Sequence, residues 1–168
     1  VASQLGDDLQ PDWGAIEPLI RLDGDDGRTL ASDHGTHVAG TLGADWRRLS
    51  PRQGDGQLEE RVLLQGVCPD INLMDFRVLV PGDLEATEFA IVAALEFIQW
   101  LNQRAGRNRP AVHGVNVSMS IPHEVKNYGC GATPVCVACD RLAASGTVVV
   151  AAAGNRGWNE EDLGFGNF

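Results

Sequence analysis

The stretch HGTHVAGT, residues 34–41, predicts a helix that is poor in side-chain bulk and has a histidine at its start. Asp33 can cap this helix, and one face carries almost no side chains because it consists of Gly35, Ala39 and Gly40. Each glycine costs a helix about 1 kcal/mol relative to alanine, so these residues make sense where the helix must lie close against another element. The positive end of the helix dipole disfavours imidazolium and helps to keep a leading histidine neutral. The eight residues together favour a catalytic base over a buried helix with two incidental histidines.

The segments on either side of this helix have little periodicity. We expect residues 1–33 to form a long connection with a short strand at Ala15–Leu22, and the helix itself to run to about Ala44. The following segment, 45–61, is polar, charged and interrupted by proline and glycine. Such a composition predicts a surface insertion that forms an irregular, flexible loop.

Downstream of residue 65, apolar runs alternate with helical periodicity. After a turn at Gly66–Pro69, the pattern predicts a strand over Ile71–Val80, a helix over Ala86–Arg104, a strand over Val112–Met119, a helix over Cys136–Ser145 and a strand over Thr147–Ala153. Nearly continuous apolar strands separated by helices are typical of a parallel sheet that is covered on both faces. We therefore expect an α/β fold, a doubly wound parallel sheet with helices on both faces. Functional groups of such sheets lie at the carboxyl ends of strands, where this sequence has Ser118–Ser120 and Gly154–Asn155.

The composition limits the class of protein. A chain of 168 residues fits one domain with a sizeable core, and 43% hydrophobic and 21% charged residues are ordinary for a soluble globular protein. A formal charge of −10 argues against nucleic acid or an anionic membrane as a partner. No apolar run approaches the roughly 18 residues that span a bilayer. The chain opens on Val1 rather than Met, so we expect the numbering to begin inside a longer precursor.

Three of the four cysteines fall within ten residues, in the order Cys130-x5-Cys136-x2-Cys139. A disulfide from Cys130 to Cys136 or Cys139 is favoured, because the surrounding glycines and proline form turns. Free thiols are the first alternative. A zinc site is the second, and it would need a fourth ligand that only the fold could bring near. We predict no metal ion and no cofactor.

Three motifs occur in a fixed order: HGTHVAGT at 34–41, NVSMS at 116–120 and VVVAAAGN at 148–155. Together they resemble the subtilisin-like serine endopeptidases, or subtilases, and Gly66-Val67-Cys68-Pro69 agrees more weakly with a turn of that family. The resemblance covers His34 to Asn155 apart from the segment 45–61. It implies a peptidase that cleaves extended peptide or protein substrates, and it favours a secreted location over a cytoplasmic one.

The resemblance also implies a role for each motif. His34 would be the general base that takes a proton from a nucleophilic serine, while His37 would be structural. The substrate would pair with an edge strand made of Ser118, Met119 and Ser120. The other wall of the pocket, for the residue before the cleaved bond, would be made of Ala152, Ala153 and Gly154. Asn155 would donate its side-chain amide to the developing oxyanion.

Two members of the expected Asp-His-Ser triad have no counterpart in this sequence. No Gly-Thr-Ser motif occurs, and the chain ends at Phe168, 13 residues after Asn155. No Asp-x-Gly lies at the family's distance before His34. We therefore expect residues 1–168 to be a partial catalytic domain that is inactive alone, with the missing parts of the same domain as its partners. The alternative is a non-catalytic subtilase-like module that binds peptides. A small-ligand domain is disfavoured because no phosphate-binding glycine motif is present.

Overall fold

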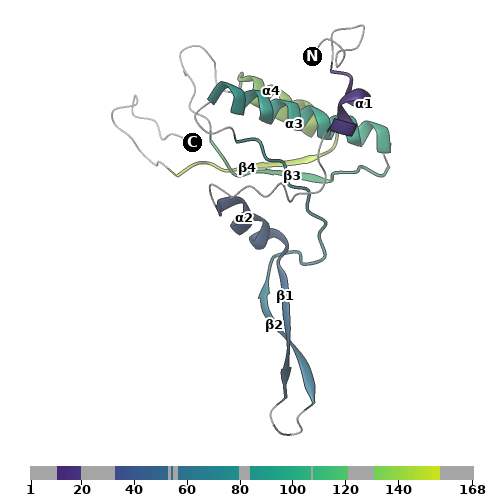
Figure 1. Ribbon diagram of the computed structural model, residues 1–168. Helices are drawn as coiled ribbons and strands as arrows, with labels where there is room; N and C mark the ends of the chain where they lie inside the picture. Colours follow the sequence, from purple (N-terminus) through teal and green to yellow (C-terminus); the bar gives the residue numbers. More distant parts are fainter. Residues whose placement is uncertain are drawn as a thin grey trace. The chain divides into compact units, whose positions relative to one another are not determined.

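The computed structural model describes residues 11–19, 33–52, 54, 57–79, 84–106, 108–120 and 131–155. The chain divides into two compact units (Figure 1). The larger unit comprises Val1–Leu22 and Phe76–Phe168, and the smaller unit comprises Asp23–Asp75. Among the described helices, none combines the length and the apolar character needed to cross a membrane.

The larger unit is built on a parallel pair of strands, β3 (Gly114–Val117) and β4 (Val148–Ala151). Two helices, α3 (Leu84–Ala105) and α4 (Pro134–Ala144), lie side by side against one face of this pair (Figure 1). The strand pair and its crossover helix α4 therefore form a βαβ unit. All four elements were predicted, although both strands are shorter and both helices begin two residues earlier than expected.

The core of the larger unit lies between the helices and one face of the strands. Its buried members are Ile91, Leu95, Ile98, Ala138 and Leu142. Val149 packs against this cluster, whereas its neighbours Val148 and Val150 point away and are 63% and 55% exposed. Within the described residues of this unit, α3 and α4 thus cover a single face of a two-stranded sheet. Parallel pairing is confirmed, but a doubly wound sheet with helices on both faces is not.

A polar side chain fixes the end of α3 to the starts of both strands. The Asn102 amide nitrogen donates to the Val112 carbonyl (2.8 Å) and to the Thr147 hydroxyl (3.0 Å). The Val112 N–H in turn donates to the Asn102 side-chain oxygen (2.8 Å). The half-buried Asn102 side chain bonds through both its nitrogen and its oxygen. It therefore fixes the C-terminal end of α3 to the starts of both strands.

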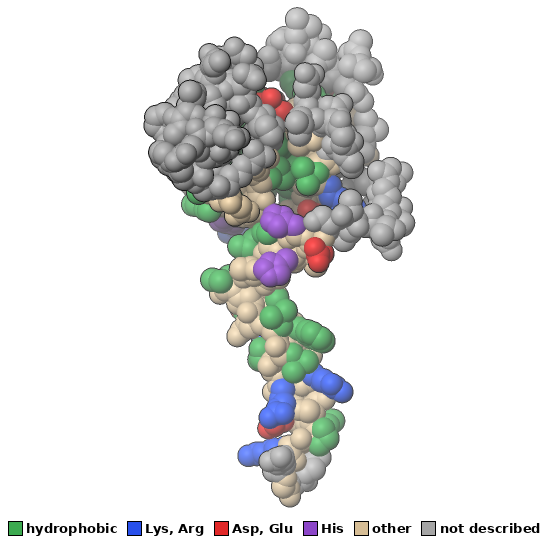
Figure 2. All heavy atoms as spheres, turned by 90° about the vertical axis from the view of Figure 1, so that its left-hand side faces the viewer, with side chains coloured by type: hydrophobic (Ala, Val, Ile, Leu, Met, Phe, Trp, Pro, Cys, Tyr) green, Lys and Arg blue, Asp and Glu red, His purple; other side chains and the backbone are tan. Residues whose placement is uncertain are grey.

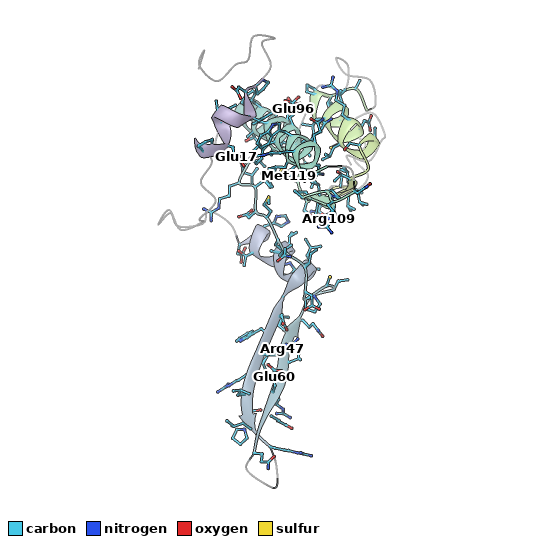
Figure 3. All side chains as sticks on the ribbon, turned by 90° about the vertical axis from the view of Figure 1, so that its right-hand side faces the viewer. Glu17, Arg47, Glu60, Glu96, Arg109 and Met119 are labelled. Carbon is cyan, nitrogen blue, oxygen red and sulfur yellow. The ribbon has the colours of Figure 1, made fainter. Side chains whose placement is uncertain are left out.

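The N-terminal strand predicted at Ala15–Leu22 is wrong over its described part. Helix α1 (Trp13–Ile16) and the 3₁₀ turn η2 (Glu17–Leu19) occupy it, and residues 20–22 lie outside the described residues. The Asp12 carboxylate accepts the Ala15 N–H (3.1 Å) and so caps the short helix. Contacts with α3 hold α1 and η2 in place. The ring centroids of Trp13 and Phe97 lie 5.5 Å apart. The Glu17 carboxylate, labelled in Figure 3, pairs with the Arg104 guanidinium at 2.6 Å.

In the smaller unit, the segment expected to be an irregular loop is an antiparallel hairpin whose register shifts between Trp46 and Arg47. Strand β1 (Asp45–Pro51) pairs with β2 (Leu58–Gln65). Arg47 bridges Asp45 on its own strand (2.6 Å) and Glu60 on the other (3.4 Å). Figure 2 shows hydrophobic and basic side chains exposed along this hairpin. Cross-strand pairing extends to Pro51, whereas Gly54 lies in the connection between the two strands. Such pairing joins residues that are separated in sequence, so the composition of the segment does not reveal it.

Helix α2 (His34–Gly43) is confirmed close to its predicted bounds, and its C-terminal end is closed by the Gly66–Cys68 segment. The N–H groups of these three residues donate to the carbonyls of Ala44 (2.7 Å), Thr41 (3.0 Å) and Leu42 (2.8 Å), respectively. The close approach predicted for the face of Gly35 and Gly40 is not found, because nothing described lies within 4 Å of a side chain added at either glycine; such approaches occur at Gly43 and Gly66 instead. Since the last carbonyls of a helix have no partner within the helix, Gly66–Cys68 satisfies them.

Replacing Gly66 with alanine should destabilise the fold. Its Cβ would lie 2.6 Å from the Ala44 nitrogen and 2.8 Å from the Gly40 carbonyl oxygen, so backbone atoms would have to move. We expect a loss of about 1–3 kcal/mol in the free energy of unfolding, measured by urea denaturation of the full-length protein. The matched control is Val67→Ala, at a side chain that is 87% exposed, where the change should stay within about 0.5 kcal/mol. Equal effects of the two substitutions would contradict the role assigned to Gly66.

The strand predicted at Ile71–Val80 is wrong: residues 71–79 form no strand, and Val80 lies outside the described residues. Its apolar side chains serve separate purposes. Ile71 and Leu73 approach Gly43 in the smaller unit, while Phe76 and Val78 pack against the core of the larger unit. An apolar run is therefore insufficient for a strand where no ladder partner is described.

Candidate functional site

The carboxyl ends of β3 and β4 bring two predicted motifs together. The last ladder pair joins Val117 to Ala151, and the Ala152 N–H then donates to the Val117 carbonyl at 3.0 Å. The next residues on each strand, Ser118–Ser120 and Ala152–Asn155, therefore start side by side. They lie at the edge where functional groups of parallel sheets gather.

The strand-β3 side of this edge is partly buried. Ser118 and Met119 are half-buried and Ser120 is exposed. The Asn116 amide nitrogen donates to the Ser118 hydroxyl at 2.8 Å, which holds that side chain beside the strand. Met119 packs against the core, as its position beside α3 in Figure 3 indicates.

The strand-β4 side is open. Ala152, Ala153, Gly154 and Asn155 are all exposed, and no large side chain rises from the first three. Gly154 has a φ of 86°, a conformation that residues with a Cβ rarely adopt, and it turns the chain directly before Asn155. The result is a flat backbone surface that ends in one exposed carboxamide.

A hollow of about 160 Å³ adjoins Met119 in the larger unit. Its walls come from the starts of α3 and α4 and from the end of β3: Glu88, Ile91, Val117, Met119, Thr133, Val135 and Cys136. Sequence reasoning missed this hollow. Its only sequence signal is the Thr133-Pro134 pair, which is typical of a helix start and would have placed the first turn of α4 correctly.

His34 is the first residue of α2 in the smaller unit, and its side chain is exposed. The prediction that the Asp33 side chain caps this helix is wrong, because Asp33 itself has near-helical backbone angles and its carboxylate makes no capping bond. Its backbone carbonyl accepts the His37 N–H instead (2.9 Å). His37 is exposed as well, one turn further along the helix. Both histidines of α2 are therefore exposed to solvent.

The predicted disulfide from Cys130 to Cys136 or Cys139 is wrong, because Cys136 and Cys139 are both free thiols. Cys130 itself lies outside the described residues. Burial, the nearby Cys136 sulfur and Asp140 raise the pKa of the Cys139 thiol, in that order of importance. As for a zinc site, the described residues hold no group of three or more histidine, cysteine, aspartate or glutamate side chains that could bind a metal ion.

Comparison with known proteins connects these observations to a family. Residues 21–165 match the subtilase family. Subtilisin DY of Bacillus licheniformis is 32% identical over 136 residues, which are 81% of this chain and 39% of that protein. The minor extracellular protease Vpr of Bacillus subtilis (strain 168) is 29% identical over 167 residues, which are 94% of this chain and 17% of that protein. The chain thus spans well under half the length of both relatives. No solved structure shows significant similarity.

Proposed function

The chain belongs to the subtilase family, and from this premise we propose that the full-length protein is a serine endopeptidase with His34 as its general base and Asn155 as its oxyanion donor. The observation that carries this proposal is the shared edge of β3 and β4, where NVSMS and VVVAAAGN end side by side within the family match. Two motifs distant in sequence thus lie at the edge where functional groups of parallel sheets gather.

In the proposed reaction, His34 takes the proton from a serine hydroxyl as that oxygen attacks the scissile carbonyl. The negative charge that develops on the carbonyl oxygen is met by the Asn155 carboxamide, which lies at the end of an open backbone surface at the sheet edge. His34 then passes the proton to the leaving amine, and repeats the transfer with a water molecule that hydrolyses the acyl-enzyme. The serine and an orienting aspartate would come from outside the 168 residues.

The proposed substrate is an extended peptide that adds a strand beside Ser118–Ser120. Within the described residues β3 pairs with β4 alone, so its other edge offers backbone N–H and carbonyl groups to a peptide. The small residues Ala152, Ala153 and Gly154 leave room for the side chain that precedes the cleaved bond. Vpr is named an extracellular protease, and we propose a secreted location here as well.

A fluorophosphonate probe tests the catalytic part of this proposal, because it labels only an activated serine nucleophile. We expect the full-length protein to be labelled and the 168-residue chain alone to remain unlabelled. Labelling of the shorter chain would contradict the proposal that its triad is incomplete. If the full-length protein bound peptides without reacting with the probe, the non-catalytic peptide-binding module would replace the peptidase.

A further inference from the structure

Helix α4 carries a pair of cysteines that the proposed peptidase chemistry does not use. Cys136 and Cys139 are separated by two residues, are both free thiols and are both half-buried. The helix that carries them crosses over between the parallel strands β3 and β4. Cys-x-x-Cys is a sequence motif of disulfide oxidoreductases.

The two thiols lie on the same side of the helix and within reach of each other. Residues three apart on an α-helix have Cβ atoms about 5–6 Å apart, and a disulfide needs about 3.5–4.5 Å. Closing the bond therefore requires a shift of about 1–2 Å.

The start of α4 can make this shift at small cost. The Cys136 N–H donates to the Thr133 hydroxyl (3.2 Å), whereas the backbone ladder of the helix begins one residue later, with the Val137 N–H on the Thr133 carbonyl (3.0 Å). The Cys136 N–H thus lies outside the backbone ladder and is held by a side-chain cap. A shift of Cys136 toward Cys139 therefore strains fewer backbone hydrogen bonds than the same shift in the interior of the helix would.

The two sulfurs differ in accessibility, and this difference suits them to different steps of a thiol–disulfide exchange. Cys136 lines the hollow of about 160 Å³ beside Met119, so a small reagent can reach it. Cys139 packs against the hydrophobic core, and burial raises its pKa, which keeps it a thiol at neutral pH. The thiolate is the reactive form of cysteine. Cys136 is therefore placed to react first, and Cys139 to react with the product.

We propose that Cys136 and Cys139 form a redox-active dithiol that reduces low-molecular-weight disulfides and closes to an intramolecular Cys136–Cys139 disulfide. The Cys136 thiolate attacks one sulfur of the disulfide RSSR, forms a mixed disulfide and expels one thiolate. The Cys139 sulfur, after losing its proton to solvent, attacks Cys136 Sγ and expels the second thiolate. The dithiol loses two electrons and two protons, and RSSR leaves as two RSH molecules.

This reaction also changes one wall of the hollow. The mixed disulfide fills space beside Met119, and ring closure draws the Cys136 sulfur toward Cys139. If the proposed peptide strand lies along Ser118–Ser120, oxidation should alter peptide affinity. That consequence rests on the proposed function, whereas the thiol chemistry itself does not.

The test treats the full-length protein with oxidised glutathione and reads each cysteine by two-step alkylation. Free thiols are blocked with N-ethylmaleimide, disulfides are then reduced, and the released thiols are labelled with iodoacetamide. We expect Cys136 and Cys139 to acquire the second label together and in equal yield, and the unreduced peptide that carries both to be about 2 Da lighter than its dithiol form. The exposed Cys68 should gain a glutathione adduct instead. A disulfide that joins Cys130 to Cys136 or Cys139 would overturn the proposal.

Two variants separate the attacking thiol from the resolving thiol. Cys139→Ser should stop the reaction at a stable glutathione adduct on Cys136, and Cys136→Ser should abolish the loss of mass that marks ring closure. The matched control Cys68→Ser should leave closure unchanged. If the adduct on Cys136 failed to accumulate in Cys139→Ser, Cys139 would not be the resolving thiol and the proposal would fail. None of these readouts depends on peptidase activity, so they remain decisive even if the fluorophosphonate test fails.

Discussion

Replacement of His34 with alanine in the full-length protein should lower kcat by about a million-fold, the loss known for removal of the base or the nucleophile in subtilisin, a relative of this chain. Without the imidazole, no group takes the serine proton during attack or returns it to the leaving amine. The measurement is steady-state hydrolysis of a chromogenic peptide, with KM determined separately to show that the peptide still binds.

His37→Ala is the matched control for this prediction. His37 lies on the same helix, is also exposed and differs from His34 by one helical turn. Loss of an exposed side chain at that position should leave kcat within about tenfold, since surface substitutions rarely cost more than about 0.5 kcal/mol of stability. A collapse of kcat in His37→Ala with a small effect in His34→Ala would reverse the assignment of the base.

Asn155→Ala should lower kcat by about 10²–10³-fold, the cost known for the oxyanion-hole asparagine of subtilisin, and should change KM little. The carboxamide is expected to meet charge that exists only in the transition state, so its loss leaves substrate binding intact. Steady-state hydrolysis of the same chromogenic peptide gives kcat and KM separately and so checks both parts of this prediction.

Asn116→Ala provides the contrast to Asn155→Ala. Asn116 holds Ser118 through a hydrogen bond of 2.8 Å and lies in the strand that leads to the proposed peptide-binding edge. Its loss should raise KM more than it lowers kcat, because it disturbs the position of the peptide and not the charge on the carbonyl. If Asn155→Ala acted on KM alone, Asn155 would be a binding residue and not the oxyanion donor.

Local sequence patterns predicted α2, α3, α4, β3 and β4, because each of these elements carries its own signal: small residues after a histidine in α2, helical periodicity in α3 and α4, and apolar runs in β3 and β4. The hairpin β1–β2 was missed because its order comes from pairs such as Trp46 with Leu64, which lie far apart in sequence. The opposite error occurred at residues 71–79, where an apolar run predicted a strand that has no described ladder partner. Strand formation depends on partners, which single-segment patterns do not contain.

The meeting of two of the predicted motifs was also predictable from the sequence, whereas the roles of their residues stay predictions. If β3 and β4 are parallel neighbours, the residues that follow both strands lie at the same edge of the sheet. This places Ser118–Ser120 beside Ala152–Asn155. Whether the cysteines form disulfides was not predictable in this way. Spacing alone allowed a bond from Cys130 to Cys136 or Cys139, whereas the structure has Cys136 and Cys139 as free thiols on one helix. The state of a cysteine depends on side-chain direction, which spacing does not specify.

The attachment of the β1–β2 hairpin has a consequence for changes in the length of its connection. The hairpin leaves the chain directly after α2 and returns at Gly66, whose N–H is bonded to the Ala44 carbonyl at 2.7 Å. Its two ends are therefore fastened to each other independently of everything between them. The ends meet at this hydrogen bond, so a longer or shorter connection between Pro51 and Leu58 should cost only a slowly growing loop entropy and leave α2, with His34, in place.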